Sequence, residues 1–317
     1  MGDFVHLHLH TEYSLLDGAA RIDKIAEKAI SDGQKAVAIT DHGAMYGAVE
    51  FYDAMKKNGI KPIIGCEVYV APRSRHLKEG KSDSSGNHLI LLCKNEEGYK
   101  NLIKLVSSAW VDGFYTKPRV DRELLEKYNE GLIALSGCLF GEVAQRITQR
   151  NMAEAESVAQ WYKSVFGDDY YLEVQNHDMV EEKEVIDGVL TISRELSIPI
   201  VATNDVHYIE KEDWEAHDVL LCIQTKSTLA QPKMRFEQHE FYMKSGDEMA
   251  ELFPDHPEAI TNTLEIADKC NYKFVYGHYL FPRYVPADGG TFTGNVHIHS
   301  DTKSLNDITD ADIINKG

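Results

Sequence analysis

The chain has 317 residues, 43% hydrophobic and 26% charged, which is enough for one large domain or two ordinary ones with a sizeable core. No run of 18 apolar residues occurs and the first residues lack a basic, apolar signal, which argues against a membrane span and predicts a cytoplasmic protein. Five cysteines at irregular spacing argue against a disulfide framework, and a net charge of −18 argues against non-specific wrapping of nucleic acid.

Short apolar runs alternate with amphipathic helical patterns over the first two thirds of the chain. The predicted strands are Phe4–His10, Ala36–Thr40, Lys61–Val70, His88–Cys93, Gly131–Ser136, Tyr170–Gln175 and Ile198–Thr203. The predicted helices between them are Ile22–Asp32, Met45–Asn58, Glu96–Ala109, Met152–Phe166 and Val180–Leu196. This alternation predicts an α/β fold with a parallel sheet, and seven strands favour a TIM-like barrel over a small open sheet.

The remainder of the chain has a different character. From about residue 211 the pattern is mainly helical, with amphipathic stretches at Trp214–Gln224 and His256–Asn271. The polar segment Pro72–Asn87 predicts a mobile loop after the third strand. Composition shifts again at Gly289–Gly290, which predicts a main domain over residues 1–288 and an atypical tail over 289–317.

Two histidines one residue apart, His8 and His10, stand in the first predicted strand. Alternate residues of a strand share a face, so both side chains can reach one ion. These residues alone leave two interpretations open: a pair of metal ligands, or a solvated histidine face on an edge strand. Asp17 follows in the turn Leu16-Asp17-Gly18, where an aspartate is also an ordinary turn residue.

Two further pairs of polar residues follow apolar strands. Asp41 and His42 come directly after the second predicted strand, and Asp205 and His207 follow the seventh. Parallel α/β folds keep their functional sites at the carboxyl ends of strands. Each pair taken alone is also compatible with a turn.

Three single residues complete the pattern. Glu67 stands inside the apolar run Ile63–Val70, where a carboxylate is unfavourable unless it is paired or metal-bound. His88 opens the fourth predicted strand, and Cys138 follows the fifth. A buried salt bridge, a structural histidine and a buried thiol are the alternative interpretations.

Together these residues offer nitrogen, oxygen and sulfur ligands at or beside predicted strand ends. This mixture suits zinc, manganese or iron better than calcium. The candidates outnumber the ligands of one tetrahedral site, so two or three divalent ions are expected. Clustered divalent ions are the usual machinery for cleaving phosphate esters, so a metal-dependent phosphoesterase is predicted.

The spacing of these motifs resembles the polymerase and histidinol phosphatase (PHP) family. It is closer still to the N-terminal PHP domain of bacterial replicative DNA polymerase III alpha subunits, over about residues 3–286. The runs that carry the resemblance are Phe4–Gly18, Ala38–Gly47, Ile64–Glu67, Ala134–Leu139, Ala202–Tyr208, Phe241–Asn262 and Cys270–Asn271. The polymerase's palm is absent from this chain, so no DNA synthesis is expected.

The resemblance implies a distorted seven-stranded (β/α) barrel that binds two or three ions of Zn, Mn or Fe. The implied metal ligands are His8, His10, Asp17, His42, Glu67, His88, Cys138, Asp205 and His207. Glu67 would bridge two ions, and Asp41 would be an acid beside the ligands rather than one of them. The implied catalytic residues are Asp41, Glu67, Asp205 and His207.

The same resemblance implies a 3′–5′ exonuclease of the proofreading type that acts on the 3′ end of a DNA primer. The expected partners are DNA, the remainder of the polymerase and a proofreading subunit, with no membrane. The basic side chains that could reach the DNA backbone are Arg73, Arg75, Lys78 and Lys81, with Lys117 and Arg119 as a second patch. Solubilising surface charge is the alternative interpretation of these residues.

Two other functions stay open. A small-molecule phosphatase of the histidinol-phosphate type would use the same metals, although the polymerase-like sequence from Phe236 to Asn271 argues against it. A metal-stabilised scaffold that docks the polymerase body or a proofreading subunit is the other.

In the tail, His297 and His299 echo His8 and His10, either as the start of a truncated second unit or as an appended extension.

Overall fold

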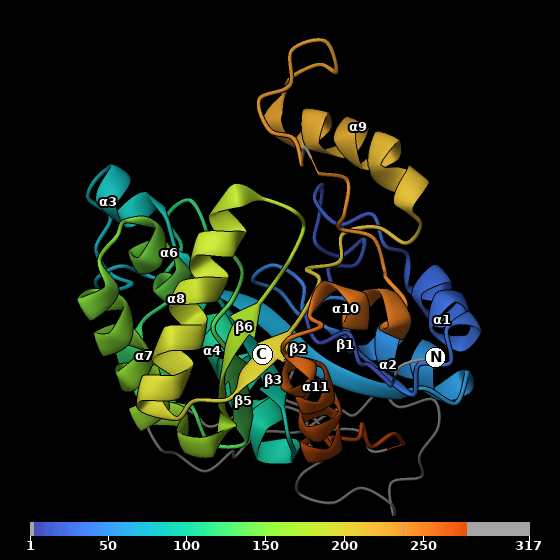
Figure 1. The fold of residues 1–317 in the computed structure, drawn as a ribbon, viewed down its shortest axis with the longest axis horizontal. Helices are drawn as coiled ribbons and strands as arrows, with labels where there is room; N and C mark the ends of the chain where they lie inside the picture. The colour runs from blue at the N-terminus through green and yellow to red at the C-terminus, as the bar shows by residue number, and fades with distance from the viewer. Residues whose placement is uncertain (1–2, 237, 278–317) are drawn as a thin grey trace, which may run out of the picture. The chain divides into compact units, whose positions relative to one another are not determined.

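A curved mixed sheet lies at the centre of the computed structural model, which describes residues 3–236 and 238–277 (Figure 1). Its strands are β1 (Ala36–Ile39), β2 (Lys61–Val70), β3 (Asn87–Cys93), β4 (Arg119–Val120), β5 (Leu132–Leu135), β6 (Tyr170–Val174) and β7 (Ile200–Ala202). The spatial order is β1-β2-β3-β5-β6-β7, and the short β4 pairs with β2.

The segment around His8 joins the two ends of this sheet. His6 forms a parallel bridge with Val37 of β1, and Leu9 forms one with Val206 just after β7. The His10 amide also donates to the Val206 carbonyl at 2.8 Å. The predicted first strand is therefore present only as isolated bridges, but these close the sheet into a distorted barrel, as expected.

One strand runs against the others, which corrects the prediction of a parallel sheet. β3 is antiparallel to both β2 and β5, whereas the remaining pairs are parallel. The loop between β2 and β3 holds only the one-turn helix α3 (Lys81–Ser84), so it does not carry the chain back along a sheet face as a parallel crossover requires. As a result, His88 at the start of β3 lies at the end of the barrel where the parallel strands finish.

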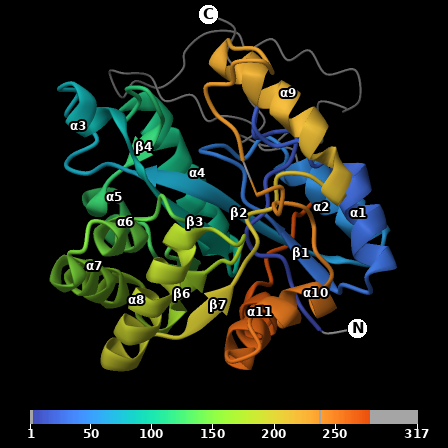
Figure 2. The same ribbon diagram turned by 45° about the horizontal axis from the view of Figure 1, so that its top comes forward.

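Helices cover the outside of the barrel, with α1 and α2 near β1 and α7 and α8 near β6 (Figure 1). The α-helices are α1 (Ile22–Ser31), α2 (Ala48–Lys57), α4 (Glu96–Val111), α5 (Arg122–Lys127), α6 (Glu142–Thr148), α7 (Met152–Phe166), α8 (Val180–Leu196), α9 (Trp214–Thr225), α10 (Gly246–Leu252) and α11 (Pro257–Lys269). Figure 2 shows α9 set apart from the helices that pack around the sheet. The helices that the sequence missed, α3, α5, α6 and α10, have at most seven residues, too few to show a clear helical period.

The apolar core and the polar cluster lie on the same inward face of the barrel. On β2 this face runs from buried Ile63 to Glu67, and on β3 it runs from Leu92 to His88. Residues two apart on a strand share a face, so each strand presents apolar side chains at one end and polar ones at the other. Ile266 of α11 packs against the apolar end.

The main compact unit spans Met1–Lys273, and a second unit begins at Phe274. The predicted boundary at Gly289–Gly290 and the pair His297 and His299 lie outside the described residues. Among the residues that the structure describes, no helix is long and apolar enough to span a membrane.

Candidate metal centre

The nine predicted ligands converge at the polar end of the barrel, although seven separate stretches of sequence contribute them. His8 and His10 come from the closing segment, and Asp17 from the turn after it. His42 follows β1, Glu67 lies in β2, His88 begins β3, Cys138 follows β5, and Asp205 and His207 follow β7. All are buried except His42 and His88, which are partly exposed.

Four acceptor groups meet at the innermost position. The Nε2 atoms of His8 and His10 are 3.1 Å apart, and Asp205 Oδ1 lies 3.0 Å from the first and 3.1 Å from the second. Glu67 is 3.4 Å from His10 Nε2. Lone pairs at these distances repel one another unless a cation lies among them, so this position fits a divalent ion.

Two further groups of three share residues with the innermost position. Glu67, His88 and Cys138 form one: His88 Nδ1 lies 2.6 Å from a Glu67 oxygen and 3.6 Å from the thiol sulfur. His10, His42 and His207 form the other. Within each of the three groups the ligand atoms lie within 4.8 Å of one another. Glu67 belongs to two of the groups, which is the geometry that a bridging carboxylate requires.

Several buried oxygens in the cluster lack a hydrogen-bond donor. Both carboxylate oxygens of Glu67, one of Asp17 and one of Asp205 have no well-formed hydrogen bond, only nearby imidazole nitrogens such as His88 Nδ1. A buried oxygen without a partner is costly unless an ion neutralises it. The donor set of imidazole, carboxylate and thiol suits zinc, manganese or iron, so the residues present fit two or three such ions.

The electrostatics of the cluster prepare it for cations. Burial raises the pKa of the Glu67 carboxyl, but two adjacent histidines lower it by more. The net result is a pKa well below its usual range. The pKa of Asp205 is depressed in the same way. Burial and neighbouring imidazoles lower the pKa of His10 to about 3. The carboxylates are therefore ionised and His10 is neutral, as metal binding requires. Burial lowers the pKa of His8 and His42, but the adjacent carboxylates raise it above its usual value, to about 10 for His42, so an ion would displace protons from these two rings.

A second layer of hydrogen bonds orients His8. Its Nδ1 lies 2.7 Å from Glu173 Oε1, and Glu173 also accepts from Thr203 and from the Gly137 amide. Because Nδ1 is bonded to this carboxylate, Nε2 is the atom that His8 presents to the cluster. Glu173 is not among the predicted residues, although a carboxylate inside the apolar run of β6 is the same signal that singled out Glu67.

Asp41 lies beside the candidate ligands rather than among them, as expected, and its catalytic role stays a prediction. Its oxygens accept from the Thr11 amide at 2.7 Å, the Thr11 hydroxyl at 2.8 Å and the Ser14 hydroxyl at 2.7 Å. The Ser14 hydroxyl gives its only proton to Asp41, so the Ser14 oxygen accepts a hydrogen bond from Nδ1 of His10, 3.1 Å away. Asp41 therefore holds the turn after His10 and fixes that ring with Nε2 free.

His207 is oriented by its own loop. Its Nδ1 donates to the Asp205 carbonyl at 2.7 Å, which leaves Nε2 as the metal-binding atom. Asp205 adopts a positive φ of 46°, a backbone conformation that residues other than glycine rarely adopt. This backbone turn brings the Asp205 carboxylate and the His207 ring to the same cluster.

Two of the basic side chains predicted to contact DNA are instead internal. The guanidinium of Arg119 is fully buried and donates to the carbonyl oxygens of Gly113, Asp83, Arg75 and Leu77. Arg75 is buried against Asp121, 2.9 Å away. Because a buried, neutralised guanidinium does not reach a phosphate in solvent, the prediction is wrong for these two residues.

The other basic candidates differ in their surroundings. Arg73 is about half exposed but pairs with the buried Asp83. That pair lies within the predicted loop Pro72–Asn87, and it is Arg75, Arg119 and Asp121 that fasten the loop to its neighbours. Lys78 and Lys81 are exposed and stay candidates for contact with DNA.

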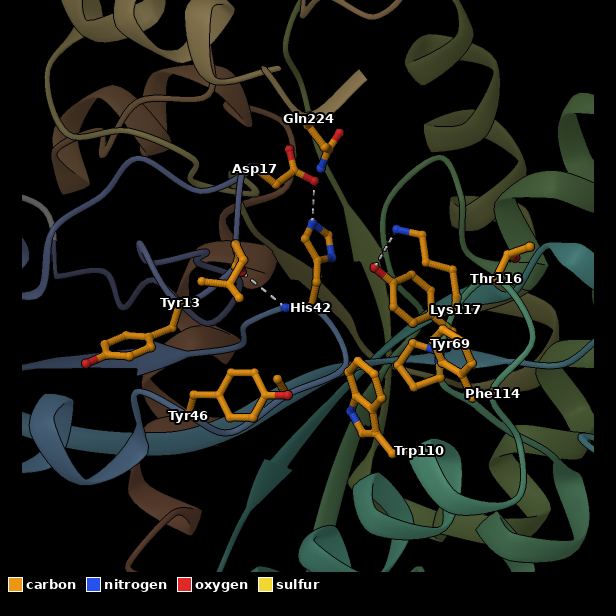
Figure 3. A pocket seen from close by; sticks show the side chains of 14 residues that line it. Tyr13, Asp17, His42, Tyr46, Tyr69, Trp110, Phe114, Thr116, Lys117 and Gln224 are labelled. Atoms are coloured by element: carbon orange, nitrogen blue, oxygen red, sulfur yellow. Dashed lines mark hydrogen bonds and ion pairs between the residues drawn. The ribbon is translucent and has the colours of Figure 1, made fainter. Parts of the chain in front are cut away.

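An aromatic cleft of about 220 Å³ opens beside the cluster (Figure 3). Asp17 and His42 line it together with Tyr13, Tyr46, Tyr69, Trp110, Phe114 and Lys117. These aromatic residues come from separate elements, so no local sequence pattern could have grouped them.

Comparison with known proteins identifies relatives. The PHP domain family model matches residues 6–177. The chain is 46% identical over 294 residues to a DNA polymerase III subunit alpha of Borreliella burgdorferi, covering 91% of this chain and 26% of that protein. It is 48% identical over 284 residues to the Treponema pallidum protein of the same name, covering 89% and 24%. The chain thus spans about a quarter of the length of these relatives.

Solved structures show weaker similarity. An amidohydrolase from Chromobacterium violaceum matches with a TM-score of 0.41 and 13% identity, over 68% of this chain and 96% of that one. A histidinol phosphate phosphatase from Lactococcus lactis matches with a TM-score of 0.31 and 13% identity, over 66% and 88%. Similarity at this level is too low to support an inference.

Proposed function

This chain belongs to the PHP domain family, and on that premise we propose that it is a metal-dependent phosphoesterase that removes nucleotides from the 3′ end of DNA. The observation that supports this most directly is the set of three overlapping ligand groups, two of which share Glu67 and two of which share His10. When bound, clustered divalent ions acidify water and neutralise charge that develops on a phosphate. The 3′ polarity rests on the resemblance to polymerase PHP domains.

The chain's own residues would divide the work as follows. Glu67 would hold two ions at a fixed separation, since it belongs to two groups. His8, His10 and His207 each present Nε2 because their Nδ1 atoms are held by Glu173, Ser14 and the Asp205 carbonyl. This preorganisation keeps the ligands from rearranging as the phosphate changes charge. Asp17 and His42 line the cleft, so a phosphate would enter from that side.

We also propose that the chain works as part of a longer bacterial replicative polymerase in the cytoplasm. The polymerase names of its relatives support this, and the chain spans only about a quarter of their length. The partners would then be DNA, the rest of the polymerase and a proofreading subunit.

A structural metal centre is the second candidate function. The complete burial of His8 and His10 favours it, because ions held there would tie the closing segment of the barrel to β2 and β7. A scaffold of this kind would bind metal in fixed ratio and turn over nothing.

One experiment separates these functions. The chain is purified, its bound metals are counted, and a 3′-labelled primer–template is offered beside p-nitrophenyl phosphate. Stepwise loss of nucleotides that disappears in Asp205→Asn, and persists in the exposed control Asp187→Asn, supports the exonuclease. Turnover of the monoester alone would indicate a small-molecule phosphatase, and stoichiometric metal without turnover of either would indicate a scaffold.

A further inference from the structure

The aromatic cleft is built beside the metal centre rather than within it. Its side chains come from different elements: Tyr46 precedes α2, Tyr69 lies in β2, Trp110 in α4, and Phe114 and Lys117 in the segment that leads to β4. Figure 3 shows Trp110, Tyr46 and Tyr69 together on one side of His42. None of these side chains is needed to hold the candidate ions, so the cleft calls for its own explanation.

Large apolar rings are left in solvent at this cleft. The exposed fractions of Tyr46, Trp110 and Phe114 are 59%, 42% and 43%. Trp110 and Phe114 are stacked, with ring planes 11° apart and centroids 5.4 Å apart. Exposed aromatic rings gathered in a cleft mark binding sites, because a flat ring partner gains both stacking and burial there.

The cleft is fixed to the metal centre by the backbone of Gly43. The indole nitrogen of Trp110 donates to the Gly43 carbonyl at 2.8 Å, directly after His42. Gly43 has a positive φ, and a Cβ there would come within 2.7 Å of Pro118. The Tyr69 ring is stacked 6.0 Å from the His42 ring. The aromatic rings therefore have a set position relative to a candidate ligand.

One cation accompanies these rings. Lys117 is exposed, its amine donates to the Tyr69 hydroxyl at 3.2 Å, and it lies 4.8 Å from the centre of that ring. Among the described residues no carboxylate forms an ion pair with Lys117, so its charge is available to an anion at the mouth of the cleft. Aromatic rings with an adjacent lysine are how proteins bind single-stranded nucleic acid.

We propose that this cleft stacks one nucleobase of single-stranded DNA while Lys117 contacts a phosphate of the same strand. This inference rests on the proposed function, because it places the scissile phosphate at the metal centre. A volume of about 220 Å³ is below the roughly 300 Å³ at which drug-sized ligand sites begin, so the cleft accommodates a single ring system. Stacking is tolerant of base identity, so binding without sequence preference follows.

The first test measures binding without catalysis. The full chain is depleted of metal with EDTA, and tryptophan fluorescence is followed as tetrathymidylate is added. Trp110→Leu should weaken binding about 5- to 100-fold, the usual effect of losing one stacked base. Trp161→Leu, a tryptophan outside the cleft, should bind as the parent does. Binding is then measured for both variants by fluorescence anisotropy of a labelled tetrathymidylate, which does not depend on their tryptophans.

Further arms separate stacking from charge and from misfolding. A tetranucleotide with abasic sites should bind the parent chain as weakly as tetrathymidylate binds Trp110→Leu. Tyr46→Ala, which removes a mostly exposed ring, should weaken binding in the same direction without affecting the fold. Lys117→Met should reduce the slope of log Kd against log salt concentration by about one, the change expected when one phosphate contact is lost. The exposed control Lys57→Met should leave the slope unchanged.

The outcomes distinguish this inference from the proposed function. Binding that needs Trp110 and a base, in a chain that cleaves no DNA, would support the cleft and overturn the exonuclease. Cleavage with unchanged KM and kcat in Trp110→Leu and Tyr46→Ala would overturn the cleft and leave the exonuclease standing. Equal binding of abasic and base-containing strands would also overturn it, because the rings would then not stack a base.

Discussion

Three histidines of the metal centre are oriented through their Nδ1 atoms, two of them by residues outside the proposed ligand set, Glu173 and Ser14. Glu173, Ser14 and the Asp205 carbonyl each accept a hydrogen bond from Nδ1 of one histidine, so each of the three rings has Nε2 free to bind an ion. The pattern His-x-His specifies only that two imidazoles share a face. The atom that each imidazole presents is decided by contacts between β6, the turn after His10 and the loop after β7.

Removal of the charge on Glu173 should weaken metal binding without removing a ligand. In Glu173→Gln the amide keeps the shape of the side chain, but the His8 ring loses its charged acceptor. Partners of this kind contribute about 10- to 100-fold to metal affinity, so a loss in that range is expected. Competition with a chelator of known affinity measures it, and the exposed Glu97→Gln serves as control. Unchanged affinity would mean that His8 is oriented by the backbone alone.

Ser14 offers a second residue-scale test because its hydroxyl links Asp41 to His10. Ser14→Ala should remove the acceptor of the His10 Nδ1 proton and leave Asp41 tied only to Thr11. We expect weaker metal binding, by about tenfold, with little loss of stability because Thr11 still holds the turn. Parallel measurement of metal content and urea unfolding would reveal a purely structural role if stability fell while metal content did not.

The proposed metal ligands could be predicted from the sequence, whereas many of the residues that surround them could not. The nine proposed ligands stand at strand ends or interrupt apolar runs, and such local signals are visible in a sequence. Glu173 carries the same signal and could have been found. The burial of Arg119 could not, because the carbonyls that surround it belong to the loop before β3 and to the end of α4.

At the scale of elements, strand positions could be predicted but not all strand directions. Six of the seven predicted strands form within a few residues of their expected ends, because apolar runs bounded by polar turns mark them. The antiparallel direction of β3 leaves no trace in periodicity. It matters for the site because only a strand that begins at the polar end can place its first residue, His88, beside Glu67.

The start of α4 gives a prediction about packing between elements. Gly98 lies in the first turn of α4, and a Cβ there would come within 1.9 Å of the Gly131 carbonyl oxygen, which precedes β5. Helix propensity alone would make Gly98→Ala stabilising by about 0.5–1 kcal/mol. The clash with backbone should reverse the sign and destabilise the fold by about 1–3 kcal/mol. Urea unfolding decides the sign, with the neighbouring exposed Glu97→Ala as reference.

At the scale of the whole molecule, the metal centre and the closure of the barrel depend on the same residues. His8 and His10 lie on the segment that bridges β1 to the loop after β7, and both face Glu67 of β2 and Asp205. Regular strand pairing does not hold this segment, since it makes only isolated bridges. Ions bound at the centre would therefore join the two ends of the sheet more firmly than the backbone alone does.

Metal should accordingly stabilise the whole domain in proportion to its concentration. A ligand that binds only the folded state stabilises it by about 2.7 kcal/mol at 100 times its Kd. The Tm should rise with added zinc or manganese and fall on chelation, and in Glu67→Gln the response should be much smaller because two of the ligand groups lose their shared carboxylate. Thermal unfolding across a metal titration measures this. A Tm that did not respond to metal in the parent chain would mean that the bridges suffice to close the barrel. A response that survived in Glu67→Gln would assign the stabilising ion to the group of His10, His42 and His207, which does not include that carboxylate as a ligand.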